Sequence, residues 1–459
     1  MFIKMKYLIF ISLVFLFHGI NYTYSIPHTI GTEFVFSYAN IDRKHESDHY
    51  KLFLTNDNNI STIVNMQWWS IKKNAQQTAS FTLKPYGIDS YEFKKEDILF
   101  TQYSGYGQIS EVPENRIMLT ASSPIRIVSQ VWTKKPDFQD LYLVPCTKSV
   151  GKNYMVQLPE PSENEFQLIQ LLPLKQDAYV NVTHYVNGKF LTKSTTTLKA
   201  NMGNDQQVMV RQYHPTMVNS SYLIEASVPI AVVAAVTCVS TESGCDYTAY
   251  MPQQLASWDG VTTNKYPDNK FLLTENTKNI FIYPPATGAQ SIPITANNEN
   301  TTVLSDNIPT LYTYQYNPSG TVEYQITTVS SSLRASRHLI NGDYIIGSNG
   351  GSCVTNILSL SNFITGRTLF APYRSNSFIE VYTKETNMNS IYLNNIPLVN
   401  LKSHVRVLSV TKYSYVALII DLSQLNANSY LLYSDDKYIA YYIDTWQNKM
   451  SCYELGYNN

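Results

Sequence analysis

Two similar stretches, "SSPIRIVSQV" at Ser122–Val131 and "SVPIAVVAAV" at Ser227–Val236, decide the expected fold. Each places serine and proline before a short run that is rich in β-branched residues. In the first run, Ile125 and Ile127 follow the two-residue period of a half-buried β-strand. The second run is apolar on both faces, which indicates a strand in the middle of a covered sheet. A proline at the first residue of a strand removes no ladder hydrogen bond, so we expect each strand to begin there.

The same pattern recurs twice in weaker form, as "EYQITTVSSSLRAS" and "NSYLLYSDDKYIAYY". Equivalent positions in the four copies are 105, 103 and 104 residues apart, at Pro124, Pro229, Ser332 and Asp436. Similarity at a fixed step is the sequence signature of repeated structural units. We therefore expect units of about 104 residues, with strands over Ile125–Val131 and Ile230–Cys238 in equivalent places of two of them.

Composition and turn signals favour an all-β fold. Tyrosine accounts for 36 residues, and only 15 % of the chain is charged. Turn dipeptides such as Asn187-Gly and Asn341-Gly separate short apolar runs, which is typical of sandwiches or barrels. We expect tandem β-sandwich-like units with less than about 10 % helix, because no long segment has a 3.6-residue period. A β-propeller-like arrangement with two blades per unit is the alternative.

The N-terminus has the form of a secretory signal. Lys4 and Lys6 precede an apolar stretch at 7–17, and Thr23 and Ser25 place small residues at the −3 and −1 positions of a cleavage site. An uncleaved anchor helix is the alternative. No later run reaches the roughly 18 apolar residues of a membrane span. The expected division is a signal peptide over 1–25 and β units over 26–150, 151–258, 259–365 and 366–459.

A secreted chain is also the setting in which asparagine glycosylation and disulfides occur. Four Asn-X-Ser/Thr triplets are candidate glycosylation sites, at Asn59, Asn181, Asn219 and Asn300. Lys plus Arg is 34 and Asp plus Glu is 35, so no bulk charge favours nucleic acid or an anionic membrane.

Five cysteines leave one without a partner if the others pair. Cys238 and Cys245 enclose "VSTESG", a length that suits a hairpin with Gly244 easing the turn, so we expect a disulfide between them. Cys353 and Cys452 lie at similar distances after the equivalent repeat positions Ser332 and Asp436, and they form the second expected pair. Cys146 is then either a buried small apolar residue or a partner for an intermolecular link.

No catalytic or metal-binding motif is visible in the sequence. The eight histidines form no HExxH, and no CxxC pair is present for zinc, so we expect no enzyme activity, metal or cofactor. Adjacent Trp68 and Trp69 must point to opposite faces of a strand. One is expected in the core and the other on the surface as a candidate contact for a partner.

Several stretches together resemble the N-terminal domain family of IgGFc-binding protein. They are "GTEFVFSYAN" with "YKLFLTN", "NRIMLTASSPIRIVSQVW", "DLYLVPCTKSVGKNYMV" and "YLIEASVPIAVVAAVTCVS" followed by a cysteine, which together span Gly31 to Asp259. That family has a small polar residue where Cys146 stands here. The cysteine-dense companion domains of mucin type are absent, since five cysteines cannot supply them.

The resemblance implies a secreted, extracellular binding or structural module that acts through protein–protein interaction. It implies no enzyme, and it transfers no immunoglobulin-contact residue to this chain. Two other functions are weighed beside it. A lectin-like module would stack exposed aromatic side chains on sugar rings, and a secreted hydrolase would place two carboxylates across a deep pocket.

Overall fold

The computed structural model describes residues 28–42, 48–101, 106–134, 137–241, 244–258, 270–273, 277–286, 292–296, 299–303, 310–313, 324–328, 332–340, 351–373, 376–401, 404–409, 415–423, 425, 427–446 and 449–458. Strands dominate these residues, as the all-β prediction requires, and α2 (Lys95–Ile98) is a helix of only four residues. The predicted signal peptide lies outside the described residues.

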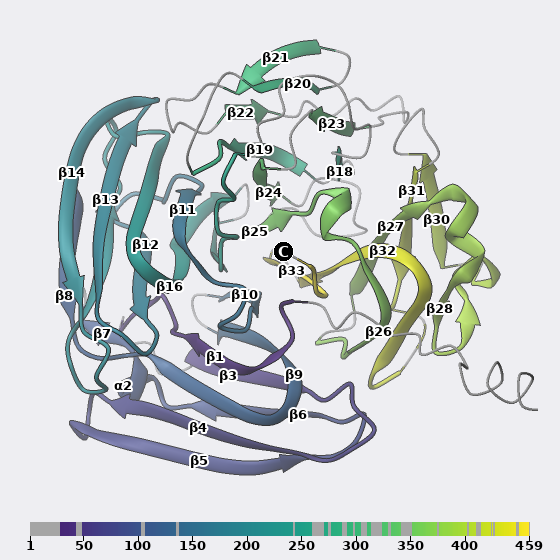
Figure 1. Ribbon diagram of the computed structural model, residues 1–459, viewed down its shortest axis with the longest axis horizontal. Coiled ribbons are helices and arrows are strands. Elements are labelled where there is room, and N and C mark those ends of the chain that lie inside the picture. The colour runs from purple at the N-terminus through teal and green to yellow at the C-terminus, as the bar shows by residue number, and fades with distance from the viewer. Residues whose placement is uncertain are drawn as a thin grey trace, which may run out of the picture.

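Two very long strands organise the first half of the chain (Figure 1). They are β9 (Ile117–Lys134) and β16 (Ser220–Thr241), and they contain the two Ser-Pro stretches. Along its first half, β9 pairs with β1 (Gly31–Phe36) and β4 (Thr62–Ser70). Along its second half, it pairs with β3 (Asp48–Thr55) and β10 (Asp137–Val144). Each long strand therefore serves two sheets in turn.

The same exchange of partners occurs in β16. Its first half pairs with β11 (Gly151–Gln157) and β13 (Ala178–Val186), and its second half with β12 (Phe166–Pro173) and β17 (Gly244–Tyr250). The predicted strands Ile125–Val131 and Ile230–Cys238 hence occupy equivalent places, which confirms that expectation.

The expected start of these strands was wrong. β9 begins at Ile117 and β16 at Ser220, several residues before Pro124 and Pro229. Pro124 lies between Ala121, the last partner of β4, and Arg126, which pairs with β3. Both prolines thus stand where the strand passes from one sheet to the other, a point at which a missing N–H interrupts no ladder.

In the last part of the chain, β32 (Tyr430–Trp446) repeats the pattern. It pairs first with β26 (Ile364–Phe370) and β28 (Ile391–Leu393), then with β27 (Ser377–Lys384) and β33 (Lys449–Glu454).

Between β16 and β32, two shorter strands take the place of one long strand. β23 (Tyr324–Thr328) pairs with β18 (Lys270–Leu273) and β20 (Ile292–Ala296), while β24 (Arg334–Ile340) pairs with β19 (Thr277–Tyr283) and β25 (Ser352–Ile357). The boundaries proposed for the four units stay predictions, although one order of pairing recurs four times.

The remaining strands extend the sheets outward or form short bridges. They are β2 (Ile41–Asp42), β5 (Ala75–Leu83), β6 (Ile88–Phe93), β7 (Phe100–Thr101), β8 (Tyr106–Val112), β14 (Lys189–Leu198), β15 (Gln206–Gln212), β21 (Glu299–Val303), β22 (Thr310–Thr313), β29 (Ile396–Pro397), β30 (Val405–Ser409) and β31 (Tyr415–Asp421). Three short 3-10 helices are also present, at Leu360–Asn362, Glu385–Ser390 and Leu398–Asn400.

Four inner strands contact one another, and three of them, β10, β25 and β33, lie near the centre of the molecule in Figure 1. We call a long strand, or the pair β23 and β24, together with the strands that pair with it a set, and number the sets in chain order. The inner strands are the last strands of the four sets: β10, β17, β25 and β33. β10 contacts both β17 and β33, and β25 contacts the same two strands from the other side. The first and last described segments also meet, because the amide of Thr29 donates to the carbonyl of Tyr457 (3.4 Å).

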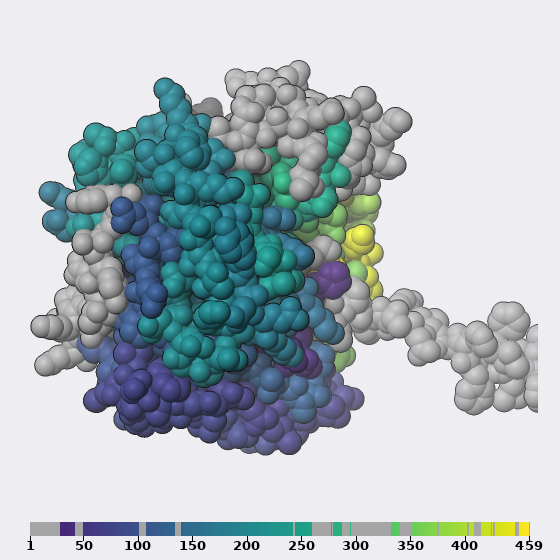
Figure 2. Space-filling view, turned by 60° about the vertical axis from the view of Figure 1, so that its left-hand side comes forward, coloured from purple at the N-terminus to yellow at the C-terminus, as the bar shows by residue number. Residues whose placement is uncertain are grey.

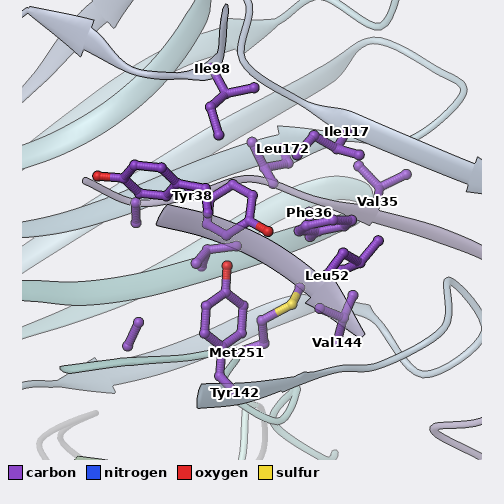
Figure 3. Close-up of a cluster of buried hydrophobic side chains, with 14 of the residues drawn as sticks. Val35, Phe36, Tyr38, Leu52, Ile98, Ile117, Tyr142, Val144, Leu172 and Met251 are labelled. Atoms are coloured by element: carbon purple, nitrogen blue, oxygen red, sulfur yellow. The ribbon is translucent and has the colours of Figure 1, made fainter. Parts of the chain in front are cut away.

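The core is continuous between the first two sets of strands. Figure 3 shows Phe36, Leu52 and Tyr142 from the first set beside Leu172 and Met251 from the second, and all five are almost fully buried. The hydroxyl of Tyr142 donates to the carbonyl of Ser37 (2.8 Å), so this polar atom is satisfied inside the core. Burial of this kind supplies most of the driving force for folding.

Both predicted disulfides are confirmed. Cys238 and Cys245 join β16 to β17 with Cα atoms 5.2 Å apart, and Cys353 and Cys452 join β25 to β33 with Cα atoms 5.8 Å apart. Gly244 has a φ of +135°, a value that suits glycine and fits its predicted role in the turn. Cys146 is a buried free thiol whose Sγ donates to the carbonyl of His28 (3.0 Å).

We expect non-reducing peptide mapping to recover these two linked pairs. Cys146 should resist alkylation in the native protein and react after unfolding, because its thiol is shielded from solvent. Its Cβ lies 2.6 Å from the place that a side chain would take at Gly31, so the two residues pack in direct contact. Rapid native alkylation of Cys146, or a linkage of Cys238 to Cys353, would contradict the pairing.

Candidate functional site

The two adjacent tryptophans take different positions on β4. Trp68 is 7 % exposed, and its ring packs edge-on against Tyr91 and Phe93, so it is the core member of the pair and not an exposed contact. Trp69 is half-buried rather than exposed, because it covers Gly203 of the second set of strands. Gly203 has a φ of +91° and leaves no room for a side chain under the indole. Trp69 therefore fills a junction between sets.

The four glycosylation candidates differ in exposure. Asn59 is exposed on the loop between β3 and β4, and Asn219 is exposed with its Nδ2 donating to Asn187 Oδ1 (3.0 Å). Asn181 is half-buried on β13. Asn300 lies on β21, and its side chain is outside the described residues. Attachment of glycans at these positions stays a prediction.

A buried carboxylate holds the inner strands together. Asp246 of β17 is fully buried, and its Oδ2 accepts from the amides of Ser352 (3.0 Å) and Met450 (2.9 Å). Its Oδ1 accepts from the amide of Gln139 on β10 (3.3 Å). One side chain thus joins β17 to β25, β33 and β10. Nearby, Lys449 Nζ donates to the carbonyl of Cys245 (2.6 Å).

Other carboxylates make similar links around the centre. Asp140 of β10 accepts from the amide of Ala249 on β17 (2.7 Å), and Glu454 of β33 accepts from the amide of Asn356 on β25 (2.5 Å). The Asn356 side chain in turn accepts from the amide of Gln253, which follows β17 (3.1 Å). These acidic groups are buried, and each joins strands of different sets.

Burial raises the pKa of Asp246 to about 8, although the amides of Ser352 and Met450 and the ammonium of Lys449 act in the opposite direction. Between pH 3.8 and about 8, the Asp246 carboxyl is therefore mostly protonated in the folded protein. In the unfolded chain, where its pKa is near 3.8, it is mostly ionised. Between these values, stability from this group decreases as the pH rises. Burial also raises the pKa of Asp140 and Glu454, so stability from these two groups decreases as the pH rises as well.

We expect the free energy of unfolding to fall as the pH increases from about 6.5 to 8, by at most about 1.4 kcal/mol per pH unit for each group. The opposite effect of His184, whose pKa burial lowers to about 4, is largest between about pH 4 and 6.5 and fades across this window. Urea unfolding at constant ionic strength measures the slope. A flat or rising stability across this window would show that these carboxyls are ionised in the folded protein.

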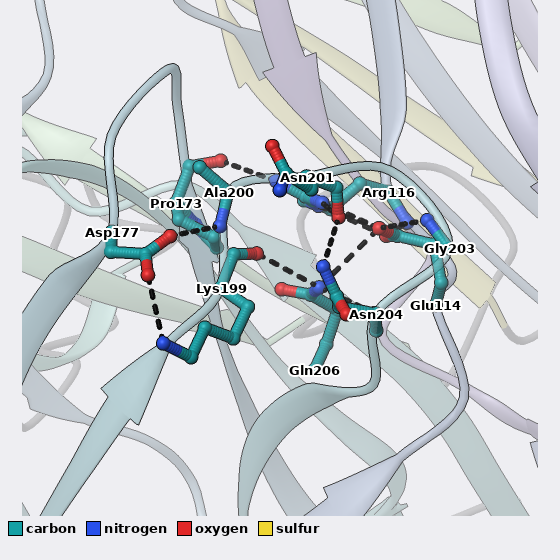
Figure 4. Close-up of polar contacts among 10 residues, drawn as sticks. All are labelled: Glu114, Arg116, Pro173, Asp177, Lys199, Ala200, Asn201, Gly203, Asn204 and Gln206. Atoms are coloured by element: carbon teal, nitrogen blue, oxygen red, sulfur yellow. Dashed lines mark hydrogen bonds and ion pairs between the residues drawn. The ribbon is translucent and has the colours of Figure 1, made fainter.

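A buried ion pair joins the first set of strands to the second (Figure 4). Arg116 Nη2 lies 2.5 Å from Glu114 Oε2, and both side chains are fully buried. Arg116 Nη1 donates to the carbonyl of Pro173 (2.9 Å), and Glu114 accepts from the amide of Gly203 (3.3 Å). Asp177 and Lys199, in the same view, form an exposed pair at 2.9 Å.

The candidate interaction surface is on the second set of strands, at the turn between β13 and β14. Phe190 is 64 % exposed and Leu191 is 44 % exposed, and the ring of Phe190 lies 6.5 Å from that of Tyr185. We refer to Tyr185, Phe190 and Leu191 as the hairpin tip. Clustered exposed aromatic and aliphatic side chains of this kind are typical anchors in protein interfaces. Figure 2 looks toward this set, whose strands face the viewer in teal.

A groove of about 610 Å³ opens beside the hairpin tip, between β14 and the strands β8 and β15. One wall has the hydroxyls of Thr192, Ser194 and Thr196, and the other has the amides of Gln108 and Gln207. Each of these groups both donates and accepts hydrogen bonds, and none of the described residues that line the groove is charged. Its chemistry suits a neutral, hydrogen-bonding ligand.

Two other grooves contain carboxylates that are already paired. A groove of about 390 Å³ between the first and second sets includes Glu33, which lies 2.8 Å from Lys175. A groove of about 280 Å³ includes Glu160, which lies 2.5 Å from Arg211. Among the described residues that line them, neither groove brings together the two carboxylates that the hydrolase alternative requires. Among the described residues, no cluster of histidine, cysteine and acidic side chains could hold a metal ion.

Sequence reasoning missed the hairpin tip, the groove and Asp246. The tip flanks Asn187-Gly188, and this dipeptide predicts a turn but gives no sign that Phe190 and Leu191 after it are exposed. The sequence "KSTTTL" after it does give a signal, because serine and threonine occupy inward positions where a sandwich core needs apolar residues. Asp246 offered a weaker signal, an acid inside the apolar strand "CDYTAY".

Comparisons with known proteins leave the family open. No protein-family model matches the chain, and no curated protein matches it. One solved structure, a "tetra-tandem repeat in extending region of large adhesion protein", aligns over 88 % of this chain and 93 % of its own, with 11 % identity and a TM-score of 0.11. A likeness at that score carries no argument about fold or function. Within the described part of the chain, no helix has the length and apolarity to cross a membrane.

Proposed function

We propose that this protein is a secreted glycoprotein that binds other extracellular proteins, with the hairpin tip as the main contact. The supporting observation is the exposure of the consecutive residues Phe190 and Leu191 beside the turn of a long hairpin. Large apolar side chains are costly to leave in water, and a partner protein that covers them gains about 25 cal/mol per Å² of apolar surface buried.

Three further features support an extracellular binding role. Two disulfides join strands of the sheets, and such bonds persist in oxidising compartments. The resemblance of residues 31–259 to the N-terminal domains of IgGFc-binding protein implies a module of this kind. The buried acidic groups join inner strands, which favours a rigid scaffold that presents its surface without large rearrangement.

The test is capture of partners from extracellular fluid on the immobilised mature chain, followed by mass spectrometry. The variant Phe190→Ser/Leu191→Ser removes the apolar contacts at exposed positions, so folding should be unaffected. Its matched control is Ile396→Ser/Val407→Ser, which removes two exposed apolar residues elsewhere. We expect proteins captured by the wild type and the control to be lost with the tip variant. Equal capture by all three would exclude the hairpin tip as the contact.

The groove beside the tip favours a second candidate, a lectin-like function. Its hydroxyls and amides match the neutral hydroxyls of a glycan, and Leu191 offers an apolar surface for the C–H face of a sugar. Binding of neutral oligosaccharides that is lost in both Gln207→Leu and Leu191→Ser, but kept in Phe190→Ser, would support this candidate. Absence of any oligosaccharide binding would exclude it.

A further inference from the structure

The outermost strand of the first set, β5, has an unusual free edge. It pairs with β4 on one side and ends its sheet on the other, in the part of the chain that the structure describes (Figure 1). Nine successive residues pair with β4 without a register shift, so the edge is straight and regular. Its sequence, "AQQTASFTL", contains no charge, proline or glycine. An edge of this length and composition is a template for pairing with another strand.

The equivalent strand of the second set, β14, is protected in the usual way. It has Lys189 and Lys193 within the strand and a register shift against β13. Lys193 Nζ lies 3.8 Å from Glu225 Oε2 of β16, and this ion pair holds the lysine side chain over the same sheet. Charged side chains and irregular register are the common devices that prevent edge-to-edge association. These devices are present on β14 and absent from β5 within one chain.

The sequence of β5 is complementary to itself in antiparallel pairing. Its midpoint is Ala79, and two copies related by a two-fold axis there place Thr78 opposite Ser80 and Gln76 opposite Thr82. These four side chains are exposed on one face of the strand. Hydroxyl pairs directly opposite each other favour strand pairing. Beyond the strand, Lys84 falls opposite Asn74 and Lys73 opposite Pro85, so no like charges meet.

We propose that β5 pairs with β5 of a second copy of this chain, and that the protein is a symmetric dimer joined through this edge. The two sheets then become one continuous sheet across the two-fold axis. A two-fold contact of one edge with itself is closed, so it yields dimers and no open polymer. This proposal does not depend on the hairpin tip, which lies on the second set of strands.

Sedimentation of the mature protein at micromolar concentration tests the proposal. The wild type should be a dimer. The variant Thr78→Lys/Ser80→Lys places lysines opposite each other twice across the axis, and should raise the dissociation constant of the dimer about tenfold or more. The matched control Thr195→Lys/Thr197→Lys makes the same change at exposed positions of β14 and should leave the dimer intact.

A charge exchange tests the register. Thr78→Glu/Ser80→Glu should weaken the dimer in the same way, and an equal mixture with the lysine variant should form a heterodimer, because each glutamate then faces a lysine. A monomeric wild type would overturn the proposal. So would a dimer that the β5 lysines leave unchanged, or a mixture that remains monomeric while each variant keeps its native circular dichroism.

Discussion

Replacement of Asp246 by alanine should lower the free energy of unfolding by about 3–5 kcal/mol. Three amides, those of Gln139, Ser352 and Met450, lose their acceptor at a fully buried site. Each buried amide left without a partner costs about 1–3 kcal/mol, and the three costs overlap because they share one site. Urea unfolding at pH 7 measures the loss.

Asp246→Asn separates the role of the acceptor from that of the titrating group. It keeps one carbonyl oxygen and the volume of the side chain, so its loss should be smaller than that of the alanine variant. It should also reduce the decrease of stability between pH 6.5 and 8. Asp89→Asn changes an exposed acid on β6 and should behave as the wild type. A loss below about 1 kcal/mol in Asp246→Ala would contradict the proposed linkage of the inner strands.

The second large effect is expected at Arg116. Arg116→Met should destabilise the protein by about 3–5 kcal/mol, because it leaves the fully buried Glu114 without its counter-charge. The carbonyls of Pro173 and Asn201 lose a donor as well. Thermal and urea unfolding both measure this loss.

Two comparisons isolate the cause. Arg116→Met/Glu114→Gln removes the uncompensated charge but keeps an acceptor for Gly203 and Gln206, and should recover part of the loss. Lys199→Met breaks the exposed pair with Asp177 in the same region and should have little effect. If Arg116→Met and Lys199→Met behaved alike, burial of the first pair would have no energetic consequence.

Local patterns in the sequence predicted the elements of the fold well. The Ser-Pro marker located equivalent strands, and the spacing of Cys238 and Cys245 located a hairpin. The marker misled only about where the strands begin. A proline after serine has the same local signature at the start of a strand and at a change of sheet. The sheet partners on either side of Pro124 are distant in sequence, so no local pattern distinguishes the two cases.

The contacts that join the sets could not be predicted from one sequence. Asp246 and Met450 are separated by 204 residues, and Arg116 and Pro173 by 57, so each contact depends on how whole sheets pack. The hairpin tip and the groove arise similarly, since both depend on which face of β14 the neighbouring strands leave open. Trp69 shows the same limit, because its exposure is set by Gly203 of another set of strands.

Native-state hydrogen exchange at three amides tests the central claim most directly, namely that one buried side chain joins four inner strands. The amides of Gln139, Ser352 and Met450 should exchange slowly in the wild type, at rates close to those of global unfolding. In Asp246→Asn, all three should exchange faster, while the amide of Leu171 in β12, which lies away from Asp246, should change only with global stability. Unchanged protection of the three amides in this variant would contradict the account.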